Sequence, residues 1–398
     1  MSLTRIGTAH MYDRTINNIG KQQSQLTSQM EHASAGKRVL RASDDPVAAA
    51  QAERARTRQS RIETDQRTLD AQTATIKYGE STLGEINGAM QEFRSLIVNA
   101  GNGAYNQTQR DTLVEQLQNL RSQILTYSNR QDSNGLPLFR GLDANSSHVF
   151  PNGTQSMQSG QTNPGEYTIT NSLDGALAFF SGKTGNGVLA VDVGATNQGL
   201  AWADVGTIRD PATAIALTTP IDITFRDGAS GGMEYSVDGT NWAAYKSGDT
   251  IAVAGMDLVI TGAPKAGDTF TVKSSERQSI FEVLDSAIKT VKDNVKPDGS
   301  TVYGGLAHGL AKSLAEIDTQ LNRVSTVRGF AGDLLNQAER MGSTLLERNE
   351  QMESQRSAAE DIDMVAALSQ LKTQETAISA ALQSYASIQK LSLFNYIN

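Results

Sequence analysis

Apolar residues near both ends of the chain recur at alternating intervals of four and three, which is the spacing of a coiled-coil seam. The repeat near the start comprises Tyr12, Ile16, Ile19, Leu26, Met30 and Ala33. The repeat near the end comprises Met364, Leu368, Leu371, Ile378, Leu382 and Tyr385. One polar residue interrupts each stripe, Gln23 in the first and Glu375 in the second. The spacing predicts a long amphipathic helix at each end of the chain.

A second repeat has a strict period of seven residues. It comprises Ile62, Leu69, Ile76, Leu83, Met90 and Ile97. Shorter stripes with the same spacing follow in segments 113–127, 280–291 and 314–324. A strict seven-residue period favours a left-handed supercoil, because a straight helix drifts by about 20° per heptad. An ordinary helical bundle core is the alternative for any single stripe, and the recurrence across five segments favours a coiled-coil rod.

The predicted helix that carries the strict seven-residue repeat begins with a recognisable capping sequence. Ser43, Asp44 and Asp45 are residues that cap helices, and Pro46 suits the first helical position. A helix from about Pro46 to about Val98 would be roughly 80 Å long at 1.5 Å per residue. This length predicts an elongated molecule.

The middle of the chain has a different composition. Residues 141–274 contain five of the eight prolines and 19 of the 35 glycines, and they hold six basic and 13 acidic residues. Strand-like alternation occurs at 167–170, 187–193, 221–225, 258–260 and 268–273, with a turn signal at Asp238-Gly239. An acidic β-rich insert is therefore predicted within a nearly neutral helical protein.

Composition excludes several classes of protein. The chain has no cysteine and four scattered histidines, so neither a disulfide nor a metal cluster is expected. The net charge of −8 argues against nucleic-acid binding. No apolar stretch approaches the length that spans a bilayer, so no membrane insertion is expected, and the N-terminus lacks the apolar core of a cleaved secretory signal.

None of the candidate catalytic motifs in the sequence is complete. Gly182-Lys183-Thr184 ends like a phosphate-binding loop, but the position that needs the first glycine holds Leu177. The acidic pairs Asp44/Asp45 and Asp361/Asp363 are interpreted as helix caps rather than as a catalytic dyad. We therefore predict no enzymatic activity and no cofactor.

Two stretches together resemble the flagellin superfamily. The first, residues 33–50, includes Ser43-Asp44-Asp45-Pro46, and the second is the C-terminal segment 379–398. Within the superfamily, Asp44-Asp45-Pro46 and the ending Leu391-Ser-Leu-Phe-Asn-Tyr-Ile resemble the branch that forms the hook–filament junction. The likeness covers both flanks of the chain and leaves the insert unassigned.

The resemblance implies an organisation into three parts. Residues 1–42 and 356–398 would form a terminal coiled-coil assembly domain, and 43–140 with 275–355 a helical rod domain. Residues 141–274 would be an inserted β-rich domain that projects outward. The expected fold is mainly α with an inserted β domain, in which long coiled-coil helices from both termini form an elongated rod. The expected assembly interface comprises Tyr12, Ile16, Ile19, Leu26, Met30, Ile378, Leu382, Tyr385 and Leu391.

The resemblance also implies partners and a location. The protein would be exported through the flagellum's own type III channel, with a cytoplasmic chaperone at the C-terminal helix. It would then lie at the distal end of the hook as a homo-oligomeric layer. Its neighbours there would be flagellin and the other hook-associated junction protein. Two other readings remain, namely a filament flagellin and a secreted adhesin that carries a glycan-binding β module.

Overall fold

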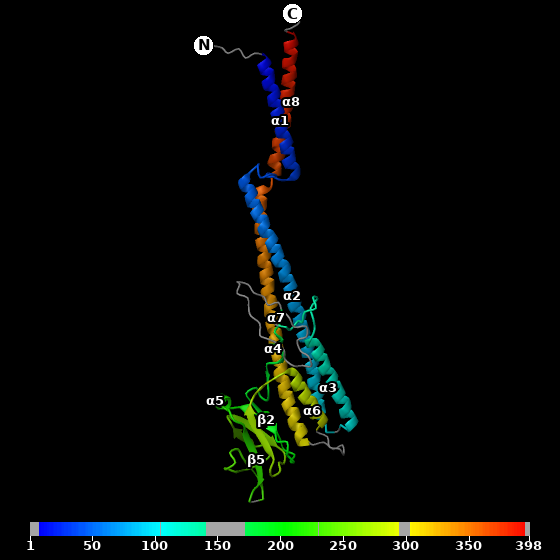
Figure 1. Ribbon diagram of the computed structural model, residues 1–398, viewed down its shortest axis with the longest axis vertical. Helices are drawn as coiled ribbons and strands as arrows, with labels where there is room; N and C mark the ends of the chain where they lie inside the picture. Colours follow the sequence, from blue (N-terminus) through cyan, green and yellow to red (C-terminus); the bar gives the residue numbers. More distant parts are fainter. Residues whose placement is uncertain (1–7, 104, 141–171, 230, 294–302, 395–398) are drawn as a thin grey trace. The chain divides into compact units, whose positions relative to one another are not determined.

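The computed structural model describes residues 8–103, 105–140, 172–229, 231–293 and 303–394 (Figure 1). The side chains of 8–12 and 388–394 lie outside this description. The chain divides into two compact units, one formed by residues 1–68 with 341–398 and the other by residues 69–340. Along the chain, long helices precede and follow a β-rich middle, so the predicted fold class is confirmed. Within the described ranges, no helix is both long and apolar enough to cross a membrane.

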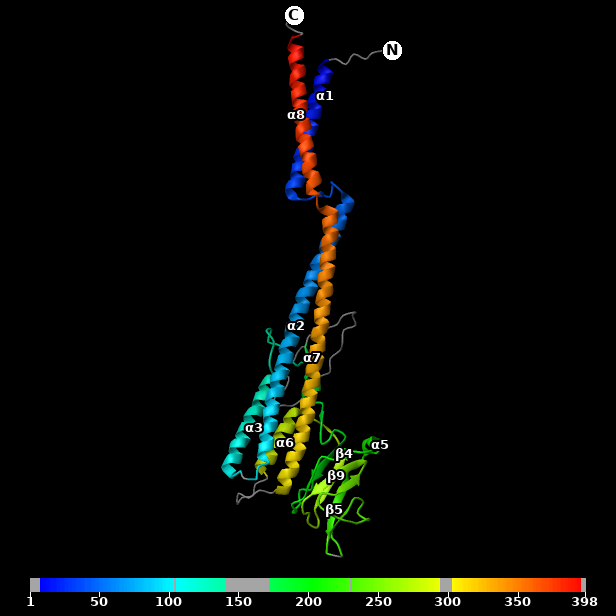
Figure 2. The ribbon, with the colours of Figure 1, turned by 180° about the vertical axis from the view of Figure 1, so that it is seen from behind.

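The first unit contains the two terminal helices. Helix α1 spans Thr8–Ala35 and helix α8 spans Met364–Phe394. They lie side by side and run in opposite directions (Figures 1 and 2). The unit also contains the beginning of α2 (Pro46–Ala100) and the end of α7 (Tyr303–Glu360).

The helical part of the second unit is built on the strict heptad stripe. Ile76, Leu83, Met90 and Ile97 of α2 are all completely buried. They belong to a core shared with helices α3 (Gln107–Ser128), α6 (Ile280–Asp293) and α7. The stripes predicted in segments 113–127 and 280–291 are also largely buried, because these helices are amphipathic and pack by their apolar faces.

Two aromatic contacts tie the start of the insert to this helical core. The short helix α4 spans Gly175–Phe179, and the ring of Phe179 packs edge-on against Phe139 at 5.2 Å. The next residue, Phe180, lies 6.4 Å from Phe281 of α6 between ring centroids. Residues 139 and 174–180 therefore pack with the helices.

The β-rich part consists of two antiparallel sheets over one apolar core. One sheet has the order β2-β10-β5-β6-β7, with strands Leu189–Val193, Thr269–Ser274, Ile221–Asp227, Met233–Ser236 and Ala243–Ala244. The other joins β3 (Trp202–Ala203), β4 (Thr207–Ile208), β8 (Thr250–Val253) and β9 (Met256–Thr261). A short helix, α5 (Pro211–Ile215), closes the end. Four of the five predicted strands are present, and the segment 167–170 lies outside the described residues.

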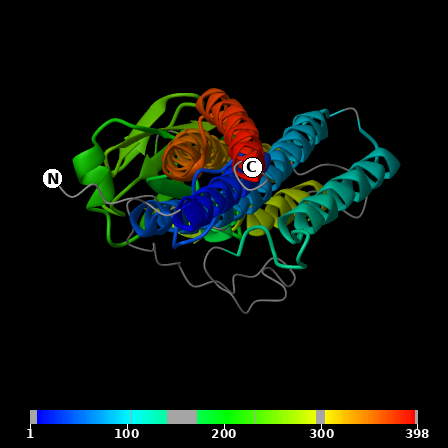
Figure 3. The same cartoon turned by 90° about the horizontal axis from the view of Figure 1, so that it is seen from above.

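A narrow neck connects this part to the helices. The strands β1 (Gly182–Lys183) and β11 (Arg277–Gln278) pair with each other, so the chain enters and leaves at one place. Seen from above, the β-rich part lies on one side of α7, and α3 lies on the other side of the helical group (Figures 1 and 3).

The neck predicts which deletion the helices tolerate. Joining Lys183 to Arg277 through a short glycine linker should preserve a cooperative helical melt, because these residues are already opposite each other. Joining Gly141 to Lys273 also removes Phe179 and Phe180, which should cost at least a further 3–5 kcal/mol. Circular dichroism at 222 nm during thermal unfolding measures both. Equal stability of the two deletions would contradict this assignment.

Candidate assembly site

The chain passes twice between the long helices, and main-chain hydrogen bonds join the two passages. One passage lies between α1 and α2 and the other between α7 and α8. The amides of Arg38 and Val39 both donate to the carbonyl of Glu360, at 2.6 and 3.2 Å. The amide of Ile362 donates to the carbonyl of Gly36 at 3.1 Å. Gly36 ends α1 with a φ of 67°, a left-handed conformation that favours glycine.

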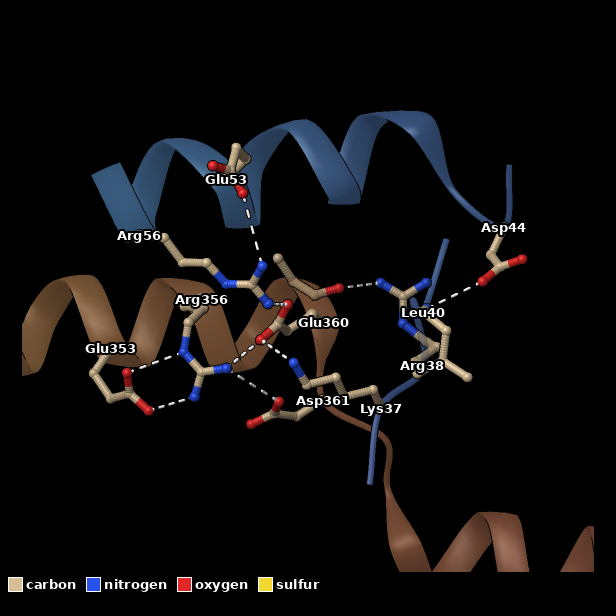
Figure 4. Close-up of polar contacts among 11 residues, drawn as sticks. Lys37, Arg38, Leu40, Asp44, Glu53, Arg56, Glu353, Arg356, Glu360 and Asp361 are labelled. Atoms are coloured by element: carbon tan, nitrogen blue, oxygen red, sulfur yellow. Dashed lines mark hydrogen bonds and ion pairs between the residues drawn. The ribbon is translucent and has the colours of Figure 1, made fainter. Parts of the chain in front are cut away.

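One buried carboxylate lies at the centre of this crossing (Figure 4). The side chain of Glu360 is only 4% exposed, and it forms ion pairs with Lys37, Arg56 and Arg356. Burial alone would raise the pKa of Glu360, but hydrogen bonds from the three cations outweigh burial and lower the pKa to about 2. The four charged groups therefore link the starts and ends of different helices.

Residues 43–46, which carry part of the family resemblance, lie at the same crossing. A carboxylate oxygen of Asp44 accepts hydrogen bonds from the amides of Leu40 and Arg41 at 3.0 and 2.8 Å. Asp45 caps α2, because its carboxylate accepts from the amides at 47 and 48. Pro46 occupies the first helical position and Ser43 lies exposed in the turn. Capping by Asp45 agrees with the interpretation of the sequence, whereas Asp44 binds the turn that precedes α2 rather than the helix.

The seam between α1 and α8 is not the predicted apolar stripe. The half-buried positions of α1 are Thr15, Ile19, Gln22, Leu26, Gln29 and Ala33, apart from His32 near its end. Those of α8 are Ala367, Leu371, Gln374, Ile378, Ala381 and Tyr385. Both sets follow the coiled-coil spacing of four and three. The side-chain oxygens of Gln22, Gln29 and Gln374 are buried without a hydrogen-bond partner. The pair is therefore closed by a partly polar seam.

Four apolar residues remain beside this seam, and we call them the apolar flank. They are Ile16, Met30, Leu368 and Leu382, which are 50–54% exposed. Each follows a seam residue by one position, so all four occupy the same heptad position. Equivalent positions of an antiparallel pair lie on the same side of the seam. Counted outward from Gly36 and Ile362, Met30 lies level with Leu368, and Ile16 with Leu382.

The structure thus divides the expected interface residues into two groups. Ile19, Leu26, Ile378 and Tyr385 lie in the seam, whereas Ile16, Met30 and Leu382 lie on the flank. Not all of them lie in the seam of the α1–α8 pair, because glutamine and alanine take half of the seam positions. A search for apolar residues passes over such positions. Tyr12 and Leu391 lie in α1 and α8, but their side chains lie outside the described residues.

The comparisons with known proteins agree with this geometry. Residues 6–144 match the bacterial flagellin N-terminal helical region. Over 98% of both chains, the sequence is 26% identical to flagellar hook-associated protein 3 of Escherichia coli (strain K12). The crystal structure of the flagellar junction protein FlgL from Legionella pneumophila aligns with a TM-score of 0.64 at 25% identity, covering 72% of this chain and 99% of that one. These matches confirm the predicted resemblance to the flagellin superfamily.

The extent of each match bears on the branch within this superfamily. The phase 1 flagellin of Salmonella naestved is 30% identical, but only over 31% of this chain and 24% of its own length. The likeness to hook-associated protein 3 extends along nearly the whole chain. The family resemblance is confirmed. The matched proteins are flagellar components, in agreement with the prediction that the chain is not an enzyme.

Replacing Glu360 by Gln should loosen the crossing, because three cations would lose their shared counter-charge. Breaking a buried ion pair typically costs about 3–5 kcal/mol. We expect faster hydrogen exchange at the amides of Val39 and Ile362, measured by NMR or mass spectrometry. The matched control is Glu353→Gln, which removes a half-exposed partner of Arg356 and should cost under about 1 kcal/mol. Equal effects of the two variants would contradict the central role of Glu360.

The crossing should also weaken in acid. Folding lowers the pKa of Glu360, so its contribution is complete above the ordinary value of 4.5 and disappears as the pH falls through about 2. Protection of the Val39 amide should therefore decrease between pH 4.5 and 2. The Glu360→Gln variant should show a smaller decrease over the same range.

Proposed function

We propose that the chain is a structural protein of the bacterial flagellum that forms the junction layer between the hook and the filament. It would do so by self-assembly through the α1–α8 pair. The observation that carries this proposal is the apolar flank, which the folded chain leaves half exposed beside a polar seam. The proposal needs no catalytic group.

The energetics of the pair favour association. Full burial of a Leu or Ile side chain contributes about 1.5–3 kcal/mol, so covering the exposed half of each flank residue adds roughly 1 kcal/mol. Four such residues on every protomer, repeated around a layer, supply several kcal/mol per contact. The seam itself contributes less than an apolar one, because buried amide oxygens without partners cost free energy.

The names of the relatives support a location for the proposed layer. The nearly full-length likeness to flagellar hook-associated protein 3 supports a place at the distal end of the hook. Flagellin and a second hook-associated protein would be its neighbours there. We also propose that the protein reaches this place by export, with a chaperone that covers the C-terminal helix beforehand. The apolar flank on α8 would give such a chaperone its binding surface.

Labelling isolated flagella with an antibody against this chain tests the location. A single band at the distal end of the hook is expected. Label along the whole filament would identify a filament flagellin instead, and an absence of label on flagella would refute the proposal.

Substitutions at three neighbouring positions test the flank. Leu382→Asp should block incorporation into flagella, because assembly would bury an unpaired charge. The melting of the isolated chain should change little, since Leu382 is half exposed before assembly.

Two controls separate assembly from folding. Gln383→Asp, at an exposed position, should incorporate normally. Ile378→Asp lies in the seam and should lower the stability of the α1–α8 pair by about 2 kcal/mol. Incorporation of Leu382→Asp at the level of Gln383→Asp would show that the flank is not an interface.

A further inference from the structure

Helix α7 contacts the β-rich part through a row of polar side chains spaced four residues apart. We call His308, Lys312, Glu316 and Gln320 the docking row. Residues at this spacing form one ridge along a helix surface. His308, Glu316 and Gln320 are 7%, 1% and 0% exposed, so the ridge is buried against the insert.

Every member of the docking row bonds to a different segment of the insert. His308 Nδ1 lies 2.9 Å from the carbonyl oxygen of Ala203 in β3. The other three contacts are Lys312 Nζ to Asp192 Oδ1 at 2.6 Å, the Gly185 amide to Glu316 Oε1 at 3.1 Å, and Gln320 Nε2 to the Gln278 carbonyl at 3.2 Å. The docking of the insert therefore depends on the protonation state of buried side chains.

His308 is the member whose charge changes near neutral pH. With Nδ1 donating to Ala203, the other ring nitrogen, Nε2, is buried without a well-formed hydrogen bond. A proton added to Nε2 would be a buried charge near the ring of Phe270, 6.5 Å away between ring centroids, and near the ammonium of Lys312. The docked arrangement is thus built for the neutral imidazole.

The groups around His308 shift its pKa in both directions. Burial lowers its pKa most, and the ammonium of Lys312 lowers it further. The carbonyls of Ala203 and Val191 and the carboxylate of Asp192 act the other way, but the net pKa remains below 6.5. The charge of Asp192 is held by Lys312 and Lys273, which keep its pKa below the ordinary value of 3.8.

We propose that His308 is a pH-sensitive latch that holds the β-rich part on α7 at neutral pH and releases it in mild acid. This inference is independent of the proposed function. A group that binds a proton only after release weakens docking up to tenfold for each pH unit below 6.5. The neck at β1 and β11 would keep the released part attached.

The titration of Glu316 has the opposite effect on docking to that of His308. Burial raises the pKa of Glu316, and the effect outweighs the Gly185 amide and the nearby Lys312 and Lys273. Its protonation on acidification favours the docked state, which is the opposite sign to His308. Removing the titration of Glu316 should therefore make the release steeper.

Hydrogen exchange on the full chain tests the proposal. Amides in 189–193 and 202–203 should exchange at least fivefold faster at pH 5.5 than at pH 7.5, after correction for intrinsic rates. Amides of α3 and α6 should be unchanged. The fluorescence of Trp202, adjacent to Ala203, gives a second readout in a Trp242→Phe background. A flat response of the insert, or equal loss of protection in the helices, would overturn the proposal.

Two variants assign the response to His308. His308→Gln should abolish the pH dependence, and His32→Gln, a histidine in the other unit, should leave it intact. If His308→Gln is already undocked at pH 7.5, the Glu316→Gln variant decides. A steeper response than that of the unmodified chain supports the latch, and an unchanged or shallower response refutes it.

Discussion

The buried carboxylate of Glu360 joins segments that are more than 300 residues apart in the chain. Removing a carboxylate from water costs several kcal/mol, and here three cations compensate for that cost. Such an arrangement adds little net stability, but it permits only one alignment of its partners. The passages around Gly36 and Ile362 are therefore held opposite each other, and both terminal helices start from a defined level.

That level determines which side chains of the terminal helices can act together. Because α1 and α8 leave the crossing in opposite chain directions, each residue of α1 has a fixed counterpart on α8. The heptad repeat then collects Ile16 and Leu382 at one level and Met30 and Leu368 at another. A shift of one residue in either helix would separate these pairs. The assembly surface is thus set by a polar contact at its base.

The sequence predicted those features of the structure that depend on the spacing of apolar residues within one helix or one strand. The strict sevens of α2 identified a stripe that is buried from Leu69 to Ile97 and half-buried at Ile62, because apolar residues filled every position. Alternate residues of the terminal stripes were assigned one position away from the seam, because Gln22 and Gln374 occupy seam positions that apolar periodicity overlooks. Four strands of the insert, β2, β5, β9 and β10, were found from their alternation, whereas β3, β4 and β8 were not predicted. The predicted segment 167–170 lies outside the described residues.

Neither the crossing nor the docking row could be inferred from spacing alone. Glu360 meets Lys37 and Arg56 only after the chain has folded back on itself. His308 and Glu316 bond mainly to main-chain atoms, and a carbonyl or amide leaves no mark in the amino-acid sequence. The spacing of four residues between successive members of the docking row was visible, but it is also common on solvated helix faces.

The distribution of polar residues between the two faces of the terminal helices affects how freely the sequence can vary. Turning each helix by about one residue would bring the apolar flank inward and bury Glu375, which is charged and exposed in the present arrangement. The actual seam contains neutral glutamines, so the burial of charge distinguishes one closed form from the other. An exposed helix position usually accepts almost any polar or small residue. Residues 372 and 375 are such positions only in appearance, because the charges of Lys372 and Glu375 both disfavour the alternative face, and variation there should be more restricted than exposure suggests.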